Sequence, residues 1–431
     1  MSVATYAGLG STPPSADPVY LEGYSAIGDG GQGFFYWDST GTETPNNGTI
    51  SAGTVSGRWK RIYNGAINVQ WFGAVGDGSN ADNAFVDAIN YAISLNNGMG
   101  GDVIIPAGSY LITNNINIYA TASIPNPNIN IIMQGGSQIL NSALILFDVQ
   151  TNSYGQAFFS LIGSPNGRCE IRCIGIPKPP PPPVPSQLHC IQLSCLSTSS
   201  FIVPRNWGKI ENILFVGGNV NCGIAIRMEN YPTGVIEKNS FIGFSYYNVY
   251  AESSWANKYI NNYHGPLNSS GFAGTAIGDG SNSLFLGERY EVGTSVPGIQ
   301  FFVINGALGG NGVRISSCSF EPCSTGIDIP ASPTGILDSL LIQSCYFETC
   351  NPINIQGPAN NDKHKTVEIN SCTVAGGSFT TEINAVEYLT ISNTNHKADL
   401  TINNTVHNFA NIMNNITGAL IDNAATIVTI P

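Results

Sequence analysis

The residues of this chain whose types and spacing could support catalysis are acids near one aromatic segment. Glu252 and Asp279 lie 27 residues apart, and Glu288 follows shortly after them. Hydrolysis of a glycosidic bond uses two carboxyl groups, about 5–5.5 Å apart for retention of configuration or roughly 6.5–9.5 Å apart for inversion. We predict Glu252 and Asp279 as the catalytic carboxyl pair, with Glu288 as the substitute, on a fold that brings residues 27 apart together.

The residues on both sides of Glu252 form the most aromatic part of the chain, where tyrosine and tryptophan alternate with polar residues. Sugar rings stack on such side chains, which lose little conformational entropy on binding. We predict Trp255, Tyr247 and Tyr290 as a glycan-binding platform and Arg289 as the contact to an acidic or hydroxylated sugar. The open alternative is that the acids are only solvated and the aromatic residues are half core.

The interval between Glu252 and Asp279 equals the period of a sequence repeat of about 27 residues. Cys318 and Cys345 are 27 residues apart, Cys372 follows after the same interval, and Phe320 and Phe347 repeat it. Each copy holds two or three strand-like runs without a helix between them, which is typical of a β-solenoid. Coils stacked about 4.8 Å apart would bury columns of like side chains. We therefore expect the cysteines as buried, reduced thiols, and equivalent residues of neighbouring coils as neighbours.

The first coil of a solenoid needs a cover, because unpaired strand edges invite aggregation. Residues 82–97 are predicted to supply it as an amphipathic helix, since Phe85, Ile89 and Ile93 share one face. Asp82 is expected to be the N-cap of this helix. Two strands, "DVIIP" and "SYLI", should follow around an Ala-Gly turn.

The stretch from Trp71 to Thr113 resembles the opening motif of the pectate-lyase-like right-handed parallel β-helix superfamily. It reads "WFGAVGDG", then an Ala/Ile-patterned helix, then "GGDVIIPAGSY", and departs only at Ala81-Asp82-Asn83, where the superfamily usually has Asp-Asp-Thr. The preceding "GFFYWD" and "GRWKRIYNG" resemble the small module ahead of this motif in bacteriophage tailspike and tail-fibre proteins. The resemblance implies a homotrimer whose head attaches to other virion tail or baseplate proteins. It also implies that the protein binds, and possibly cleaves, a host surface polysaccharide.

The predicted fold is all-β: a right-handed, single-stranded parallel β-helix with an N-terminal capping α-helix and a small β head module. Four segments are expected. Residues 1–66 form the virion-attachment head, 67–112 the opening motif with the capping helix and first coil, 113–400 the β-helix body, and 401–431 terminal coils or a trimer-closing β segment.

Composition excludes several classes of function. The formal net charge is -12, and Lys60-Arg61 is the longest basic run, so the chain lacks the basic footprint that nucleic acid needs. No apolar run of 18 residues is present, so no membrane span is expected. The amino terminus lacks a basic segment followed by an apolar one, so we expect no signal peptide. We expect the protein to be assembled in the host cytoplasm and to be part of the virion tail. The His and Cys spacings suggest no metal, and we predict no cofactor.

We favour a viral tailspike or tail-fibre receptor-binding protein that attaches to host polysaccharide. Whether it also cleaves the glycan stays open. Glycoside hydrolysis is favoured over lyase chemistry, because the sequence contains no Asp-x-Asp cluster that could hold calcium. Two alternatives remain: a non-viral, monomeric polysaccharide hydrolase of the same fold, and a purely structural virion component without a ligand.

Overall fold

The computed structural model divides the chain into two compact units. Unit 1 is Met1–Gly175 with Ser197–Ser199, and unit 2 is Ile176–Leu196 with Ser200–Pro431. The structure describes the chain apart from residues 99, 144, 152–157, 175–188, 196–207, 219–221, 232, 269–270, 279, 303–309, 332–335, 358–362, 376–379, 398, 403–407, 413–414, 417–419, 423–426 and 430–431. The proline-rich segment 178–185 therefore lies outside the described residues. No helix in the described part of the chain has both the length and the apolar character to cross a membrane.

Unit 1 begins with a small β module, as the sequence predicts. Its five strands run in the order β1-β2-β3-β5-β4, and the strands β2, β3, β5 and β4 pair antiparallel. One hydrophobic cluster fills it: Leu9, Val19, Leu21, Phe35 and Trp59. The elements are β1 (Ser2–Val3), α1 (Tyr6–Leu9), a 3-10 helix (Pro14–Ala16), β2 (Val19–Leu21), β3 (Gly33–Asp38), β4 (Ile50–Ala52) and β5 (Arg58–Arg61).

The predicted capping helix is present as α2 (Asp82–Gly98), and it packs against β8 (Gly101–Ile105), β10 (Ile116–Tyr119) and β11 (Asn128–Met133). Its buried apolar side chains are Ala84, Phe85, Ala88, Ile89, Ala92 and Ile93, so the predicted apolar stripe is confirmed. The backbone leaves the helical region at Leu95, and Asn96 and Asn97 have φ of 54° and 58°. Around it lie β6 (Ile67–Asn68), a 3-10 helix (Val69–Phe72), β7 (Asp77–Asn80), β8 (Gly101–Ile105), β9 (Gly108–Ile112) and β10 (Ile116–Tyr119).

Asp82 has a different role from the predicted N-cap. Its carboxylate accepts hydrogen bonds from Thr113 N at 2.7 Å, Asn114 Nδ2 at 2.7 Å and Asn80 Nδ2 at 3.0 Å. Burial alone would raise the pKa of Asp82, but the hydrogen bonds from Thr113 and Asn80 outweigh it and lower the pKa. The carboxylate therefore ties the start of α2 to the turn after β9.

The remaining strands of unit 1 add two further coils by parallel pairing. β11 (Asn128–Met133) and β14 (Phe158–Gly163) follow β8, and β12 (Ser137–Asn141) and β15 (Glu170–Cys173) follow β9. β13 (Ile145–Thr151) follows β10. Each side-chain row on one coil therefore lies beside the matching row of the next.

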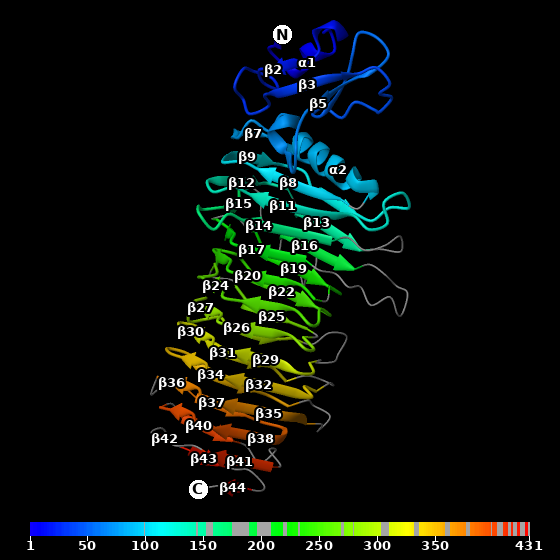
Figure 1. Ribbon diagram of the computed structural model, residues 1–431. Helices are drawn as coiled ribbons and strands as arrows, with labels where there is room; N and C mark the ends of the chain where they lie inside the picture. Colours follow the sequence, from blue (N-terminus) through cyan, green and yellow to red (C-terminus); the bar gives the residue numbers. More distant parts are fainter. Residues whose placement is uncertain are drawn as a thin grey trace. The chain divides into compact units, whose positions relative to one another are not determined.

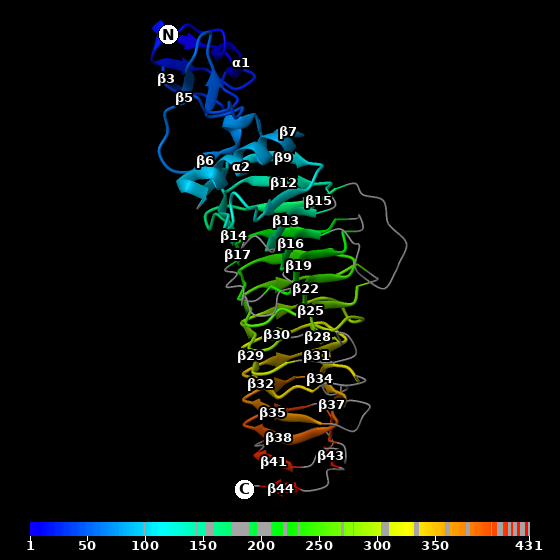
Figure 2. The same ribbon diagram turned by 90° about the vertical axis from the view of Figure 1, so that its right-hand side faces the viewer.

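Unit 2 continues this architecture as a parallel β-helix with three sheets, so the predicted fold class is confirmed (Figure 1). Figure 2 shows β31 (Thr325–Ile329), β34 (Asn351–Ile355) and β37 (Thr380–Ile383) in successive coils. The first sheet contains β17 (Gly208–Glu211), β20 (Val235–Glu237), β23 (Lys258–Ile260), β26 (Leu284–Leu286), β29 (Val313–Ser316), β32 (Ser339–Gln343), β35 (His364–Asn370), β38 (Val386–Ser392), β41 (Asn408–Ile412) and β44 (Ile427–Thr429).

The second sheet contains β18 (Leu214–Val216), β21 (Ser240–Ile242), β24 (Tyr263–His264), β27 (Arg289–Tyr290), β30 (Ser319–Phe320), β33 (Tyr346–Phe347), β36 (Thr373–Val374), β39 (Asn395–His396) and β42 (Asn415–Ile416). The third sheet contains β16 (His189–Cys195), β19 (Ile224–Glu229), β22 (Tyr247–Glu252), β25 (Ala273–Ile277), β28 (Ile299–Phe301), β31 (Thr325–Ile329), β34 (Asn351–Ile355), β37 (Thr380–Ile383), β40 (Asp399–Ile402) and β43 (Leu420–Asp422).

The interior of unit 2 holds stacked columns of like side chains. The inner ring column stacks with centroid distances of 4.3–5.3 Å and consists of Phe215, Phe241, His264, Tyr290, Phe320 and Phe347. The pair Phe320 and Phe347 lies in register, which confirms the predicted 27-residue repeat in this region. Cys318, Cys345 and Cys372 are buried free thiols. The hydrogen bond with Cys318, together with burial, raises the pKa of Cys345, as expected for an unreactive core thiol.

Candidate functional site

The candidate site lies on the outward face of the third sheet of unit 2, at β19, β22 and β25 (Figure 1). On β22, Val249 and Ala251 are fully buried and pair with Ile226 and Met228 of the previous coil. Successive side chains of a strand point to opposite faces. Tyr250 and Glu252 therefore face outward.

Strand register brings charged residues of two coils together at this face. Glu229 pairs with Glu252, and Arg227 pairs with Tyr250. Arg227 Nη2 lies 3.3 Å from Glu229 Oε2 and 3.9 Å from Glu252 Oε2. Tyr250 also donates its hydroxyl hydrogen bond to Glu252 Oε2 at 3.3 Å. One guanidinium group thus lies between two carboxylates of neighbouring coils.

A group of rings adjoins these charges, and we call it the outer aromatic cluster. Tyr250 stacks on Phe302 at 4.9 Å, and Ala276, on the coil between them, is part of the same buried group. Phe272 stacks on Tyr246 at 5.4 Å and on Tyr247 at 5.7 Å, and Phe272 is 51% exposed. The cluster consists of Tyr246, Tyr247, Tyr250, Phe272 and Phe302.

The hydroxyl groups of Tyr247 and Tyr250 stay protonated. Burial raises the pKa of Tyr247 to about 12. Burial, together with the charge of Glu252, raises the pKa of Tyr250. Both phenols can therefore donate and accept hydrogen bonds throughout the neutral pH range.

This arrangement has the chemistry of a carbohydrate-binding surface. Phe272 offers an open ring face to the apolar side of a sugar. The side chains of Glu229 and Glu252 are 32% and 31% exposed, and their oxygens can accept hydrogen bonds from sugar hydroxyl groups. Pockets for such ligands combine aromatic walls with a few polar groups that fix orientation.

The structure separates Glu252 from Glu288. Glu252 lies at this face, while Asp279 lies outside the described residues. Glu288 is 1% exposed and points into the core, where Asn262 N donates to its Oε1 at 2.9 Å and His264 Nε2 lies 2.9 Å from its Oε2. The prediction that Glu288 could substitute in catalysis is wrong, because no glycan can reach a side chain inside the coil.

Glu288 is buried because it occupies a corner column between the first and second sheets. Asn239 and Asn262 hold the equivalent corners of the two preceding coils, and each side-chain oxygen accepts a hydrogen bond from the backbone of the coil before it. The Glu288 carboxylate likewise accepts a hydrogen bond from the backbone N–H of Asn262, and Cys318 occupies the equivalent corner of the next coil. Its oxygen atoms therefore satisfy buried donors of the fold.

The predicted glycan platform is only partly brought together. Tyr247 belongs to the outer aromatic cluster, and Trp255 is half-buried just after β22. Tyr290 is fully buried between His264 and Phe320, with ring centroids 4.3 Å and 5.1 Å away, so its prediction as a platform residue is wrong. Arg289 is exposed but lies on the second sheet, where it pairs with Glu291.

The predicted site residues did not include six residues of this site: Arg227, Glu229, Tyr246, Tyr250, Phe272 and Phe302. The coil between β19 and β22 is short, so Tyr247 pairs with Ile224, 23 residues earlier. The next coil pairs Tyr250 with Ala276, 26 residues later. A search with a 23-residue interval would have found Glu229 as the neighbour of Glu252, but the 27-residue repeat pointed elsewhere.

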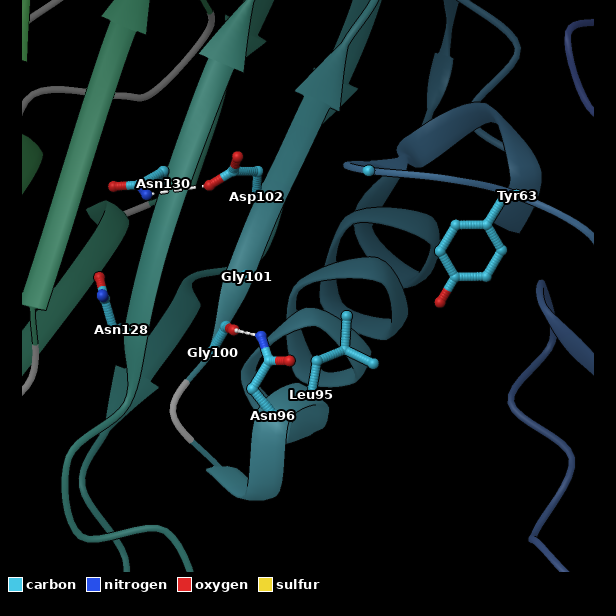
Figure 3. Close-up of a pocket in the computed structure, with 9 residues that line it drawn as sticks. Tyr63, Leu95, Asn96, Gly100, Gly101, Asp102, Asn128 and Asn130 are labelled. Carbon is cyan, nitrogen blue, oxygen red and sulfur yellow. Dashed lines mark hydrogen bonds between the residues drawn. The ribbon is translucent and has the colours of Figure 1, made fainter.

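Unit 1 also has a pocket of about 790 Å³ beside the end of α2 (Figure 3). Asn130 Nδ2 donates to Asp102 Oδ1 at 2.9 Å, and Asn96 Nδ2 donates to the Gly100 carbonyl at 2.9 Å. Asp102 is the one carboxylate in its lining, so the pocket does not hold a carboxyl pair. Its lining is Tyr63, Gly65, Leu95, Asn96, Gly100, Gly101, Asp102, Asn128 and Asn130.

Two known families match consecutive regions of the chain, one ending at residue 64 and the other beginning at residue 66. Residues 2–64 match the family described as phage tail protein small four-stranded beta-sheet domain. Residues 66–165 match the family described as rhamnogalacturonase A/epimerase, pectate lyase-like. The chain thus carries a region similar to a phage tail domain, followed by a region similar to pectate-lyase-like proteins. The predicted resemblance is confirmed for both regions, and no curated protein matches the chain.

Several solved structures are similar to this chain. WceF of Pantoea stewartii, a glycan biofilm modifying enzyme with a tailspike-like parallel β-helix, is 13% identical over 98% of this chain and 49% of its own, with a TM-score of 0.39. Tailspike protein 4 of bacteriophage CBA120 is 14% identical over 99% of this chain and 50% of its own (TM-score 0.39). Tailspike gp49 of Acinetobacter baumannii bacteriophage Fri1, a capsular polysaccharide depolymerase, is 11% identical over 99% and 76% (TM-score 0.43). The chain spans about half the length of the first two.

Proposed function

We propose that this chain is a phage tail receptor-binding protein that attaches to a host cell-surface polysaccharide through the outer aromatic cluster. One observation carries the proposal: a region that matches a phage tail domain precedes a β-helix whose outward face carries the outer aromatic cluster, exposed at Phe272, and, at the other end of the same strands, the carboxylates of Glu229 and Glu252. A tail protein with an exposed sugar-binding surface is suited to host attachment. This combination favours the viral reading over a free polysaccharide hydrolase.

Within this proposal, the Glu229–Glu252 pair binds sugar and does not cleave it. Glycosidases keep the space between their two carboxyl groups open for the glycosidic oxygen and, in inverting enzymes, a water molecule. Here both carboxylates face the same guanidinium group, since Arg227 Nη2 lies 3.3 Å from Glu229 Oε2 and 3.9 Å from Glu252 Oε2. Purified protein incubated with host polysaccharide should release no new reducing ends. Reducing ends that appear with the wild-type protein and are absent with Glu252→Gln would contradict this assignment.

The proposal assigns virion attachment to residues 1–66 and assembly to a homotrimer. Three copies of a weak glycan site would bind a repetitive polysaccharide together, which raises apparent affinity without any new contact. Light scattering on the full chain tests the trimer, since a mass near 46 kDa in solution would contradict it.

Adsorption to host cells tests the receptor function directly. Phe272→Ala should reduce cell-bound protein several-fold, because it removes the open ring face. Tyr388→Ala is the matched control, since Tyr388 is also 51% exposed but lies on the first sheet. Wild-type protein that fails to adsorb would instead support a structural virion component, and equal losses in both variants would remove the outer aromatic cluster from the proposal.

A further inference from the structure

A second pocket, of about 370 Å³, lies on unit 1 beside β12 and β15. Two glycine turns stack to form it: a Cβ on Gly135 would come within 2.9 Å of Gly167 Cα, so only glycine permits this approach. Gly136 N donates to the carbonyl of Arg168 at 2.8 Å, which fixes the start of the arginine-bearing strand. The pocket is lined by Gly136, Ser137, Gln138, Arg168, Glu170 and Arg172.

A nearly buried carboxylate orients two arginines in this pocket. The side chain of Glu170 is 4% exposed; its Oε2 pairs with Arg168, and its Oε1 accepts from Arg172 Nε at 2.5 Å. Gln138 Nε2 donates to the same Oε1 at 2.9 Å, and Ser109 Oγ donates to Gln138 Oε1 at 3.2 Å. Burial would raise the pKa of Glu170, but the hydrogen bonds from Arg172 and Gln138 outweigh it and lower the pKa. Glu170 is therefore a fixed anion with its own hydrogen bonds satisfied.

The two guanidinium groups remain accessible beyond this anchor. The side chain of Arg168 is 63% exposed and that of Arg172 is 38% exposed. Each guanidinium carries five N–H donors, and Glu170 takes only some of them. The pocket contains two cations and one anion, an excess of positive charge on a chain whose formal net charge is -12.

We propose that Arg168 and Arg172 bind the carboxylate of an acidic sugar, a hexuronate unit of the host polysaccharide. The inference rests on the proposed receptor function for its ligand source and adds the class of polysaccharide. Arginine binds carboxylates through paired, charge-assisted hydrogen bonds, and guanidinium groups held in place lose less freedom on binding. Gln138 and Ser137 line the pocket with the arginines, and both side chains suit the hydroxyl groups of the same sugar.

The test compares two ligands that differ in one group. D-glucuronate and D-glucose are titrated separately into the full-length protein, and binding is followed by saturation-transfer NMR. D-glucuronate should bind and D-glucose should bind at least tenfold more weakly. Raising the salt concentration should weaken D-glucuronate binding, since both arginines are partly exposed. Equal binding of the two sugars would overturn the proposal.

Variants separate recognition from support of the fold. Arg168→Gln and Arg172→Gln should each weaken D-glucuronate binding roughly tenfold, as expected for the loss of a charge-assisted hydrogen bond. Arg314→Gln, at an exposed arginine of β29, is the control and should bind as wild type. Glu170→Gln removes the anion that orients both guanidinium groups, so D-glucuronate binding should weaken even though both arginines remain. Wild-type D-glucuronate affinity in both arginine variants would overturn the assignment.

Host-cell adsorption distinguishes the two proposals. If D-glucuronate binding behaves as expected but the wild-type protein does not adsorb, the receptor function fails and the acidic-sugar site stands. If the protein adsorbs and the double variant Arg168→Gln/Arg172→Gln adsorbs equally well, the receptor function stands and the assignment of this pocket to the host glycan fails.

Discussion

Unit 2 contains two groups of stacked rings that are alike in chemistry and opposite in placement. The inner ring column fills the core, and Tyr290 and Phe320 within it are fully buried. The outer aromatic cluster uses similar ring distances, such as 4.9 Å between Tyr250 and Phe302, but opens to solvent at Phe272. Stacking geometry alone therefore does not mark a binding site; the face of the strand does.

The same contrast holds for the acids. Glu288 and Glu252 each lie two positions from a tyrosine in the sequence, yet Glu288 completes hydrogen bonds inside the coil while the partly exposed Glu252 lies 3.9 Å from Arg227 on the outward face. Burial without partners would be costly for a carboxylate, so the core position requires the donors that Asn262 and His264 supply. The difference assigns one acid to stability and the other to recognition.

The largest expected effect is on stability, from ring truncation. Phe320→Ala should lower the free energy of unfolding by about 3–5 kcal/mol, because it leaves a cavity within the inner ring column. Phe272→Ala should lower it by about 1 kcal/mol or less, since half of that side chain is already in water. Denaturant unfolding of both variants measures this, and similar losses would break the distinction between the two groups.

Acid substitutions should divide in the same way. Glu288→Ala should cost about 3 kcal/mol, because it removes the acceptor for buried donors of Asn262 and His264. Glu252→Ala should cost about 1 kcal/mol or less, as is usual for a partly exposed ion pair. The same denaturant series reports both values, and a large cost for Glu252→Ala would give it a structural role.

Removal of single hydroxyl groups should give a smaller difference. Tyr290 and Thr275 share a buried hydrogen bond of 3.1 Å, so Tyr290→Phe should cost about 1 kcal/mol. Tyr247→Phe should change stability by less than about 0.5 kcal/mol near neutral pH. Thermal unfolding of the two variants provides the check; a reversed order would contradict the assignment of inner and outer rings.

The smallest effect is a dependence on alkaline pH. The pKa of Tyr247 is about 12 in the folded chain, against 10.0 for an unperturbed tyrosine. Above pH 10 the unfolded chain loses this proton while the folded chain keeps it, so stability falls as the pH rises from about 10 to 12. Tyr247→Phe should remove part of that fall. If melting temperatures of the variant and wild type decline equally between pH 9 and 12, this account of the cluster is incorrect.

Several features of this protein follow from the sequence alone. The apolar stripe of Phe85, Ile89 and Ile93 predicted the capping helix, because apolar residues four positions apart share one face of a helix. The interval of 27 residues between Phe320 and Phe347 predicted the length of one coil in this region, because like residues at a constant spacing stack in register. The opening motif and the head strands likewise indicated the two regions that match known families.

Tertiary structure decided which residues share a face. Local coil length varies, so Glu252 lies beside Glu229 of a 23-residue coil, and no single repeat length predicts that pair. Tyr247 and Tyr290 look equivalent in the sequence, yet strand register and the position of the corner turns place one outside and the other in the core. A strand has two faces and a side-chain period of two, so one residue added to or removed from a coil reverses inside and outside.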